Sequence, residues 1–147
     1  MTGTRSERAR AKSAPWHLWV VGGLALVWNG LGALTIELAQ LGALPGLAPD
    51  EIVYYATKPV WLVITTALAT YGCVAGSLLL LLRHRAAVPV FAGALACIIV
   101  SDGAELTSGG SRAYANATAA IVTAIILLIT VALLCYSLAM RRRGILR

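Results

Sequence analysis

Long apolar stretches separated by short polar ones run along the whole chain, and four of them are long enough to span a membrane. The hydrocarbon core of a bilayer is about 30 Å thick, so a helix needs about 20 apolar residues to cross it. The four stretches cover residues 18–39, 60–82, 86–105 and 115–140. The third reaches this length only if residues 102–105 continue the helix towards the headgroups. The pattern predicts an all-α integral membrane protein with one transmembrane domain over residues 1–147, in which four antiparallel helices form a bundle.

The first stretch predicts a helix with one bulky face and one small face. At about 100° per residue, one side gathers Val20, Leu24, Val27, Leu31, Leu34 and Leu38. The opposite side carries Gly22, Ala25, Asn29, Ala33 and Gln40, with Glu37 beside it. Helices in lipid associate through small residues and interhelical hydrogen bonds. We therefore expect the bulky face to meet lipid and the small face to pack against the other helices.

The other three stretches also carry small or polar residues at helical spacing. The second contains the GxxxG pair Gly72 and Gly76, with Thr65 and Ala69 on the same side, and the third carries Gly93, Cys97 and Ala104. In the fourth, a repeat of seven residues places these side chains on one seam: Asn116, Thr123, Thr130 and Ser137. A sustained seven-residue repeat tracks one side of a left-handed helix pair. We expect these faces to line the helix contacts.

The longest connection, residues 41–59, contains a further helix start. Pro49, Asp50 and Glu51 combine a proline at the first helical position with carboxylates near the positive end of the helix dipole. We expect residues 52–55 of this segment to lie along the membrane surface before Pro59 opens the second span.

Composition supports a membrane protein rather than a water-soluble domain. Apolar residues make up 59% of the 147 residues and charged residues only 12%, about half of the roughly 25% typical of soluble domains. The mean hydropathy of +0.81 agrees. A cleaved signal peptide is a weaker interpretation of the first span, because its apolar run is longer than such peptides carry.

The basic residues predict how the spans are oriented. Ten of the twelve Lys and Arg residues lie within residues 1–15, 83–85 and 141–147, whereas five of the six acids lie in or near the opposite connections. Lys and Arg stay on the cytoplasmic side. We therefore expect a multi-pass protein of the cell's inner membrane, with both basic tails (1–15 and 141–147) in the cytoplasm. Because topology and anionic lipid already account for these charges, we expect no nucleic-acid partner.

Four polar residues are candidates for binding. Asn29 lies well inside the first span, where an unpaired amide is costly; an interhelical hydrogen bond is the favoured interpretation, and contact with a substrate or ion is the alternative. Glu37, Asp102 and Glu105 are expected to cluster near the outer ends of the first and third spans. They form either a proton- or cation-binding site or, as we favour, a set of solvated acids that Lys58 and Arg112 neutralise.

Catalytic, metal and cofactor motifs are missing from the sequence. The three cysteines (Cys73, Cys97 and Cys135) all fall within predicted spans without a CxxC motif, so we expect them to be small packing residues. The two histidines have no metal-binding spacing. We expect no enzymatic activity, no metal and no cofactor.

Several short motifs resemble a group of small bacterial four-span proteins of uncharacterised role. They are Pro15-Trp16-His17-Leu18-Trp19, the stretch LVWNGLGA at residues 26–33, and RRRGILR at residues 141–147. Members of this group continue the Gly-Ala pair with Asp-Tyr, whereas this chain continues with Leu34-Thr35-Ile36. Some members carry an automatic sugar-transporter label, although a bundle this thin is expected to have little room for a sugar unless several copies assemble.

Two functions from different classes fit the sequence. The leading hypothesis is a non-enzymatic accessory or structural component that acts through helix–helix contacts, with the lipid bilayer and either further copies or other membrane proteins as partners. The alternative is a small oligomeric transporter of a small solute or ion, coupled to protons through Glu37, Asp102 or Glu105.

Overall fold

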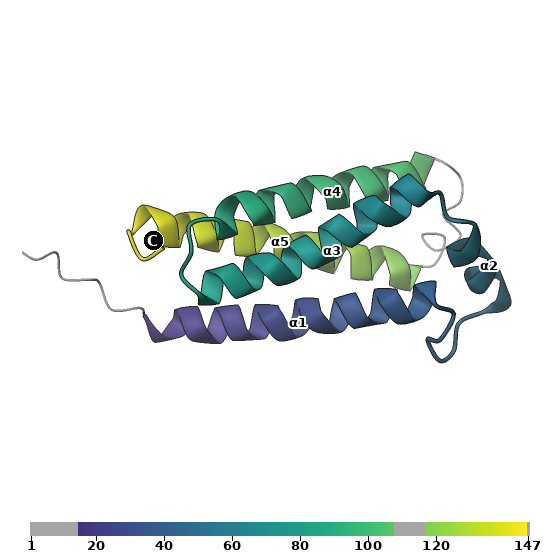
Figure 1. The fold of residues 1–147 in the computed structure, drawn as a ribbon, viewed down its shortest axis with the longest axis horizontal. Helices are drawn as coiled ribbons and strands as arrows, with labels where there is room; N and C mark the ends of the chain where they lie inside the picture. Colours follow the sequence, from purple (N-terminus) through teal and green to yellow (C-terminus); the bar gives the residue numbers. More distant parts are fainter. Residues whose placement is uncertain (1–14, 108–116, 147) are drawn as a thin grey trace, which may run out of the picture.

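The computed structural model describes the backbone of residues 15–107 and 117–146, and side chains for residues 15–107 and 120–146. The described residues form five helices: α1 (Trp16–Gln40), α2 (Pro49–Thr57), α3 (Val60–Leu81), α4 (Ala87–Thr107) and α5 (Ala117–Arg142). The four long helices lie side by side, and we call them the bundle (Figure 1). The short helix α2 lies at one end, the α2 end. The α3–α4 turn marks the other end, the turn end.

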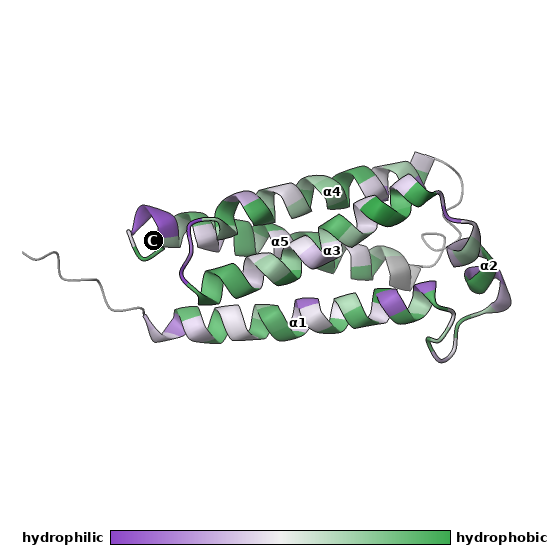
Figure 2. Ribbon diagram, in the orientation of Figure 1, coloured by the Kyte–Doolittle hydropathy of each residue, from purple (hydrophilic) through white to green (hydrophobic). Residues whose placement is uncertain are grey.

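Within the part of the chain that the structure describes, four helices are long and apolar enough to span a membrane: Trp16–Gln40, Val60–Leu81, Ala87–Thr107 and Ala120–Arg142. Their bounds lie within a few residues of the four predicted spans, and α4 continues through residues 102–105 to Thr107. Hydrophobic residues dominate these helices, whereas hydrophilic ones gather at α2, at the α3–α4 turn and at the end of α5 (Figure 2). Large side chains such as Leu24 and Leu128, 67% and 69% exposed, point outward. This surface suits lipid, so the chain has the features of a multi-pass membrane protein.

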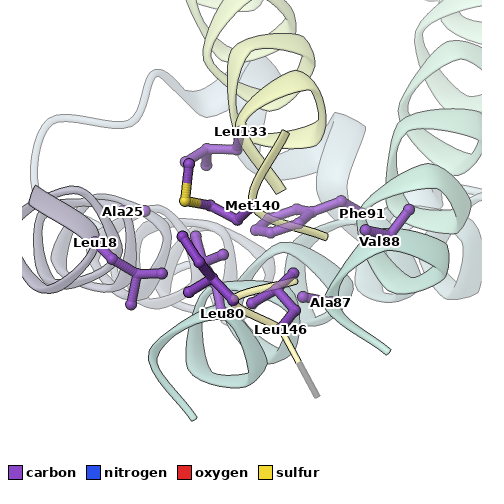
Figure 3. Packing of buried hydrophobic residues seen from close by; sticks show 10 residues of the cluster. Leu18, Ala25, Leu80, Ala87, Val88, Phe91, Leu133, Met140 and Leu146 are labelled. Atoms are coloured by element: carbon purple, nitrogen blue, oxygen red, sulfur yellow. The ribbon is translucent and has the colours of Figure 1, made fainter. Parts of the chain in front are cut away.

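A tightly packed core fills the turn end. It contains ten buried residues from all four long helices and from the segment after α5: Leu18, Ala25, Leu80, Ala87, Val88, Phe91, Leu133, Met140, Ile145 and Leu146. Their side chains converge in Figure 3, with the Phe91 ring and the Met140 thioether between the helices. Phe91 is fully buried. Close packing of this kind gives the bundle a defined helix arrangement at this end.

The α3–α4 contact depends on the two glycines of the GxxxG pair. A Cβ atom built on Gly76 would lie 2.9 Å from ring atoms of Phe91, and one on Gly72 would lie 3.0 Å from the Cβ of Ala94. Real Cβ atoms essentially never come within 3.0 Å of a neighbour. Because these two glycines have no side chains, the Phe91 ring and Ala94 can pack directly against α3.

The small face of α1 packs against the other helices and its bulky face is mostly exposed, as the residue pattern predicts. Gly22 and Ala25 are buried, and Asn29 and Ala33 are half-buried. On the other side, five of the six aliphatic residues are exposed (Val20, Leu24, Val27, Leu31 and Leu34), while Leu38 is half-buried. On α5, Thr130 and Ser137 are buried and Thr123 is half-buried, so the seven-residue repeat follows the inner face. Asn116 lies outside the described residues.

Two small-residue predictions are wrong. Gly93 is exposed, with nothing within 4 Å of a Cβ built on it, because the buried face of α4 follows Ala87, Phe91, Ala94, Ile98 and Ser101 instead. Because α3 contributes glycines to this contact, the residue that α4 packs against them can be as large as Phe91. Cys135 is exposed, so it is not a packing residue within this chain.

The segment after α5 is not the simple basic tail that the sequence predicts. Gly144 adopts a φ of +71°, a left-handed conformation that glycine tolerates well. The chain therefore reverses, and the N–H of Ile145 donates to the Met140 carbonyl at 3.0 Å. Ile145 and Leu146 are 6% and 1% exposed. Nε atoms of Arg83 and Arg85 donate to the carbonyls of Ile145 and Leu146, which ties this segment to the α3–α4 turn.

Candidate functional site: a cavity at the α2 end

A cavity of about 700 Å³ lies among the helices at the α2 end. Its walls come from α1 (Trp28, Asn29, Gly32 and Ile36), α3 (Thr66, Ala69, Thr70 and Cys73), α4 (Ile98, Ser101, Asp102 and Glu105) and α5 (Val122, Thr123 and Ile126). Small-molecule sites in proteins commonly measure about 300–1,000 Å³. The expectation that the bundle has little room for a sugar unless several copies assemble is therefore wrong, because this single chain holds a cavity of that size.

Short side chains line the cavity at Gly32, Ala69 and Ser101. Ala69 and Ser101 are buried, and Ala69 belongs to a second core cluster with Ile98. Gly32 is exposed, and nothing lies within 4 Å of a Cβ built on it. At the turn end, by contrast, the Phe91 ring occupies the space beside Gly76. The unfilled space beside Gly32 therefore distinguishes the α2 end from the packed turn end.

Helix α2 and the residue after it form the rim of the cavity. Glu51 Oε2 accepts a hydrogen bond from the Ala48 N–H at 2.9 Å, which satisfies a donor at the helix start. Pro59 then begins α3 at the N-cap position. This folding brings Glu51, Tyr54, Tyr55 and Lys58 onto the cavity lining. The predicted helix start is confirmed, but the two tyrosines contribute to a cavity wall.

Lys58 and Glu105 form an ion pair in the cavity wall. The Nζ–Oε1 distance is 2.6 Å, and the two side chains are only 6% and 12% exposed. The ammonium also lies 5.6 Å from the centre of the Tyr54 ring, within the range of a cation–π contact. A buried pair of this kind is costly to break, because removing one ion leaves the other without its compensating charge.

Asn29 makes an interhelical hydrogen bond and also lines the cavity. Its Nδ2 donates to the Ser77 Oγ at 2.9 Å, and the Ser77 hydroxyl in turn donates to the Cys73 carbonyl at 2.8 Å. The amide is therefore held between α1 and α3. The Nδ2 also donates to the Cys73 carbonyl at 3.5 Å, so both of its N–H groups are used and the group that Asn29 offers to a ligand is its carbonyl oxygen.

The three predicted acids do not form one cluster. Asp102 and Glu105 line the cavity, whereas Glu37 is not among the lining residues. The Glu37 Oε1 accepts a hydrogen bond from the Tyr71 hydroxyl at 2.5 Å, so this carboxylate faces α3 rather than α4. Lys58 pairs with Glu105, as the neutralisation hypothesis expects, and Arg112 lies outside the described residues.

Three hydroxyl groups of the cavity wall donate to their own helices. Thr66 and Thr70 of α3 donate to the carbonyls of Leu62 and Thr66 at 2.9 and 2.8 Å. Ser101 of α4 donates to the Ile98 carbonyl at 3.1 Å. Each hydroxyl has one proton, which these bonds use, so each can only accept a hydrogen bond from a ligand. The lining also carries donor groups, on Trp28, Tyr54, Tyr55 and Lys58.

Negative charge also acts on the rim. The pKa of the Tyr55 hydroxyl is raised above its usual value, first by burial and then by the nearby carboxylates of Glu105 and Glu51. Tyr55 is therefore protonated throughout the physiological range.

The sequence pattern did not indicate Tyr54, Tyr55 and Glu51 as site residues. The proline directly after Lys58 was the available signal, since it restricts the preceding backbone and keeps α2 close to the start of α3.

The described part of the chain contains few other reactive or metal-binding groups. Its cysteines are free: Cys73 is buried and lines the cavity, and Cys97 is half-buried. No group of three or more His, Cys, Asp and Glu residues is arranged there to hold a metal ion.

No protein-family model matches the sequence, and comparisons with curated proteins and with solved structures find no match. The cavity is therefore the feature of the molecule that bears on its function.

Proposed function

We propose that the protein binds a small solute in the cavity at the α2 end as a step in carrying it across the membrane. The cavity is the observation that supports this function, because it lies among four helices long enough to span a bilayer and combines apolar walls with a few polar groups. The packed core at the turn end supports a conformation that is closed to the solute at that end. Asp102 and Glu105 are the carboxylates that a coupled proton would use.

Filling the cavity should abolish solute flux. In proteoliposomes, the test follows uptake of labelled glucose, choline, 2-phenylethylamine and amino acids of each charge. We expect at least one solute to enter faster than in protein-free vesicles. Gly32→Trp should remove this excess, because Gly32 lines the cavity and has open space beside it.

Gly93→Trp is the matched control, since Gly93 also has open space but does not line the cavity. It should keep the flux. Equal uptake with and without protein for every solute, or equal loss in both variants, would contradict the proposal.

The topology is part of this proposal. The spans are antiparallel and lie in the inner membrane, with both termini and the α3–α4 turn in the cytoplasm, and the α2 end faces outward. The distribution of ten of the twelve basic residues supports this orientation. Alkaline phosphatase fused after Gly46 should be active, because that residue lies in the connection between α1 and α2, and phosphatase fused after Arg147 should be inactive. Activity after Arg147 and none after Gly46 would mean that the protein has the opposite orientation in the membrane.

An accessory role through helix–helix contacts is a second candidate. Gly23 and Gly30, seven residues apart on α1, both have nothing within 4 Å of a Cβ built on them. Small residues on an outer surface let another helix approach closely, which favours a second copy of this chain or another membrane protein. Gly30→Ile should then reduce cross-linking of the protein in native membranes, and unchanged cross-linking would remove this candidate.

A further inference from the structure

We propose that an acyl chain of a membrane lipid enters the cavity sideways, through a lateral opening flanked by Trp28 on α1 and by Val122 and Ile126 on α5. This inference goes beyond the proposed function, because it assigns a lipid-binding site that does not depend on solute transport. The contacts of the two helices, the depth of the opening and the hydrogen bonding of the wall each support it.

Helices α1 and α5 leave the lateral opening between them towards the α2 end. Within the described residues, α1 packs mainly against α3, and α5 packs against α4. The two helices meet at the turn end, where the His17 Nδ1 and the Tyr136 hydroxyl form a hydrogen bond of 2.6 Å. Further along, Trp28, Val122 and Ile126 line the cavity and are nevertheless 46%, 47% and 39% exposed. Side chains that belong both to the cavity wall and to the outer surface mark the place where the cavity opens.

The lateral opening lies at the depth of the hydrocarbon core. Trp28 is the middle residue of α1, and the cavity wall continues along this helix to Ile36. At about 1.5 Å per residue, these two residues are about 12 Å apart along the helix axis. One leaflet contributes about 15 Å of hydrocarbon, which is half of the bilayer core. The cavity is therefore about as long as the hydrocarbon of one leaflet, and lipid chains are what lies beside its opening.

The deeper part of the cavity has no charged side chain among its described lining residues. The charged ones lie at the α2 end, either on the rim (Glu51 and Lys58) or near the C-terminal end of α4 (Asp102 and Glu105). The deeper wall is uncharged and consists of Trp28, Asn29, Ala69, Cys73, Ile98 and Ile126. The change from charged to uncharged residues with depth follows the change from headgroups to hydrocarbon in a leaflet.

Polar groups of the wall already have partners, so hydrocarbon can cover them. Both N–H groups of Asn29 donate to α3. The hydroxyls of Thr66, Thr70 and Ser101 donate to carbonyls of their own helices. An apolar neighbour is costly to a polar group mainly when it leaves a hydrogen-bond donor unpaired. An acyl chain can therefore lie against these four residues without leaving their donors unpaired.

A flexible chain fits the lateral opening better than a helix of a second copy does. Helices in lipid associate through small residues that let their backbones approach closely. The side chains that flank the opening, Trp28, Val122 and Ile126, are bulky. Gly23 and Gly30, which have open space beside them, lie on the opposite side of α1 from Trp28 at about 100° per residue. A second helix is therefore better accommodated at that other side.

The test uses protein reconstituted in phosphatidylcholine that carries a photoactivatable diazirine within one acyl chain. After irradiation, mass spectrometry identifies the labelled residues. We expect labelling of Ala69 and Ile98, which line the cavity and are only 4% and 7% exposed, in addition to the outward-facing Leu128. Leu80 lies in the turn-end core and should stay unlabelled.

Gly32→Trp should abolish the labelling of Ala69 and Ile98, because Gly32 lines the cavity and has open space beside it for the indole ring. Gly93→Trp is the matched control, since Gly93 also has open space but does not line the cavity. It should leave the labelling of both residues unchanged. Continued labelling of Leu128, and not of residues in the turn-end core, verifies that each variant folds.

Labelling confined to outward-facing residues, or equal loss in both tryptophan variants, would overturn the inference. Protection of Ile126 together with the deeper cavity residues would mean that a second copy covers the opening, and this result would overturn it as well. The proposed function is tested separately by solute flux. If Gly32→Trp stops the flux while the lipid labels only outward-facing residues, the lipid site fails and the proposed function stands. If the lipid labels the cavity and no solute is carried, the lipid site stands alone.

Discussion

Lys58→Met should lower the free energy of unfolding by about 3–5 kcal/mol, the range typical of removing one member of a buried ion pair. Methionine keeps much of the length of the lysine side chain but removes the ammonium that lies 2.6 Å from Glu105. Both side chains are nearly inaccessible, so water cannot replace the lost charge efficiently. Thermal unfolding in mild detergent measures the effect, with intrinsic fluorescence as the signal.

The double variant Lys58→Met with Glu105→Met tests the mechanism. Replacing both members of a buried pair by apolar residues is often neutral or stabilising, so this variant should recover most of the loss. Arg142→Met is the matched control, because Arg142 is exposed at the end of α5 and should change stability little. A double variant as unstable as Lys58→Met would mean that Lys58 stabilises the protein through its contact with Tyr54 rather than through Glu105.

Gly76→Val should destabilise the bundle by about 1–3 kcal/mol, the usual cost of overpacking a core. The Cβ of the new side chain would meet the ring of Phe91 at 2.9 Å, and Phe91 is held in place by the rest of the turn-end core. The ring and the backbone of α3 therefore have to move apart. The same detergent unfolding assay measures the change.

Gly93→Val provides the comparison, since nothing lies within 4 Å of a Cβ at that position. It should leave stability nearly unchanged. Gly76→Val combined with Phe91→Ala should cost less than the sum of the two single substitutions, because the smaller residue makes room for the valine. Equal effects of the two glycine substitutions would show that helix propensity, and not the contact with Phe91, governs the result.

The helices and their outer faces could be predicted from the sequence, because both depend on local patterns. Apolar length sets the spans, and the spacing of Leu24 and Leu31 against Gly22 and Ala25 sets the faces of α1. The register of α4 was harder to predict. Gly93 and Ala94 are neighbours with similar small side chains, and only the position of Phe91 opposite Gly76 decides which of them is buried.

The cavity could not be predicted, because it depends on side chains of several helices leaving the space between them unfilled. Nothing near Gly32 in the sequence shows that no ring will fill the space beside it. The separation of Glu37 from Asp102 and Glu105 likewise depends on Tyr71 lying opposite Glu37. The position of Tyr54 and Tyr55 depends on the path of residues 41–59, which hydropathy alone does not determine.

The internal hydrogen bonds of α3 have a consequence for how the protein is made. Thr66, Thr70 and Ser77 donate to carbonyls of their own helix, so α3 satisfies these hydroxyl donors before it meets any neighbour. Donors that are satisfied within a helix do not oppose its entry into the bilayer. The Tyr71 hydroxyl of α3, Asn29 and the Lys58–Glu105 pair, by contrast, find their partners only when other segments arrive. We therefore expect α3 to enter the membrane first, and the polar contacts that join the helices to form in a later step of biogenesis.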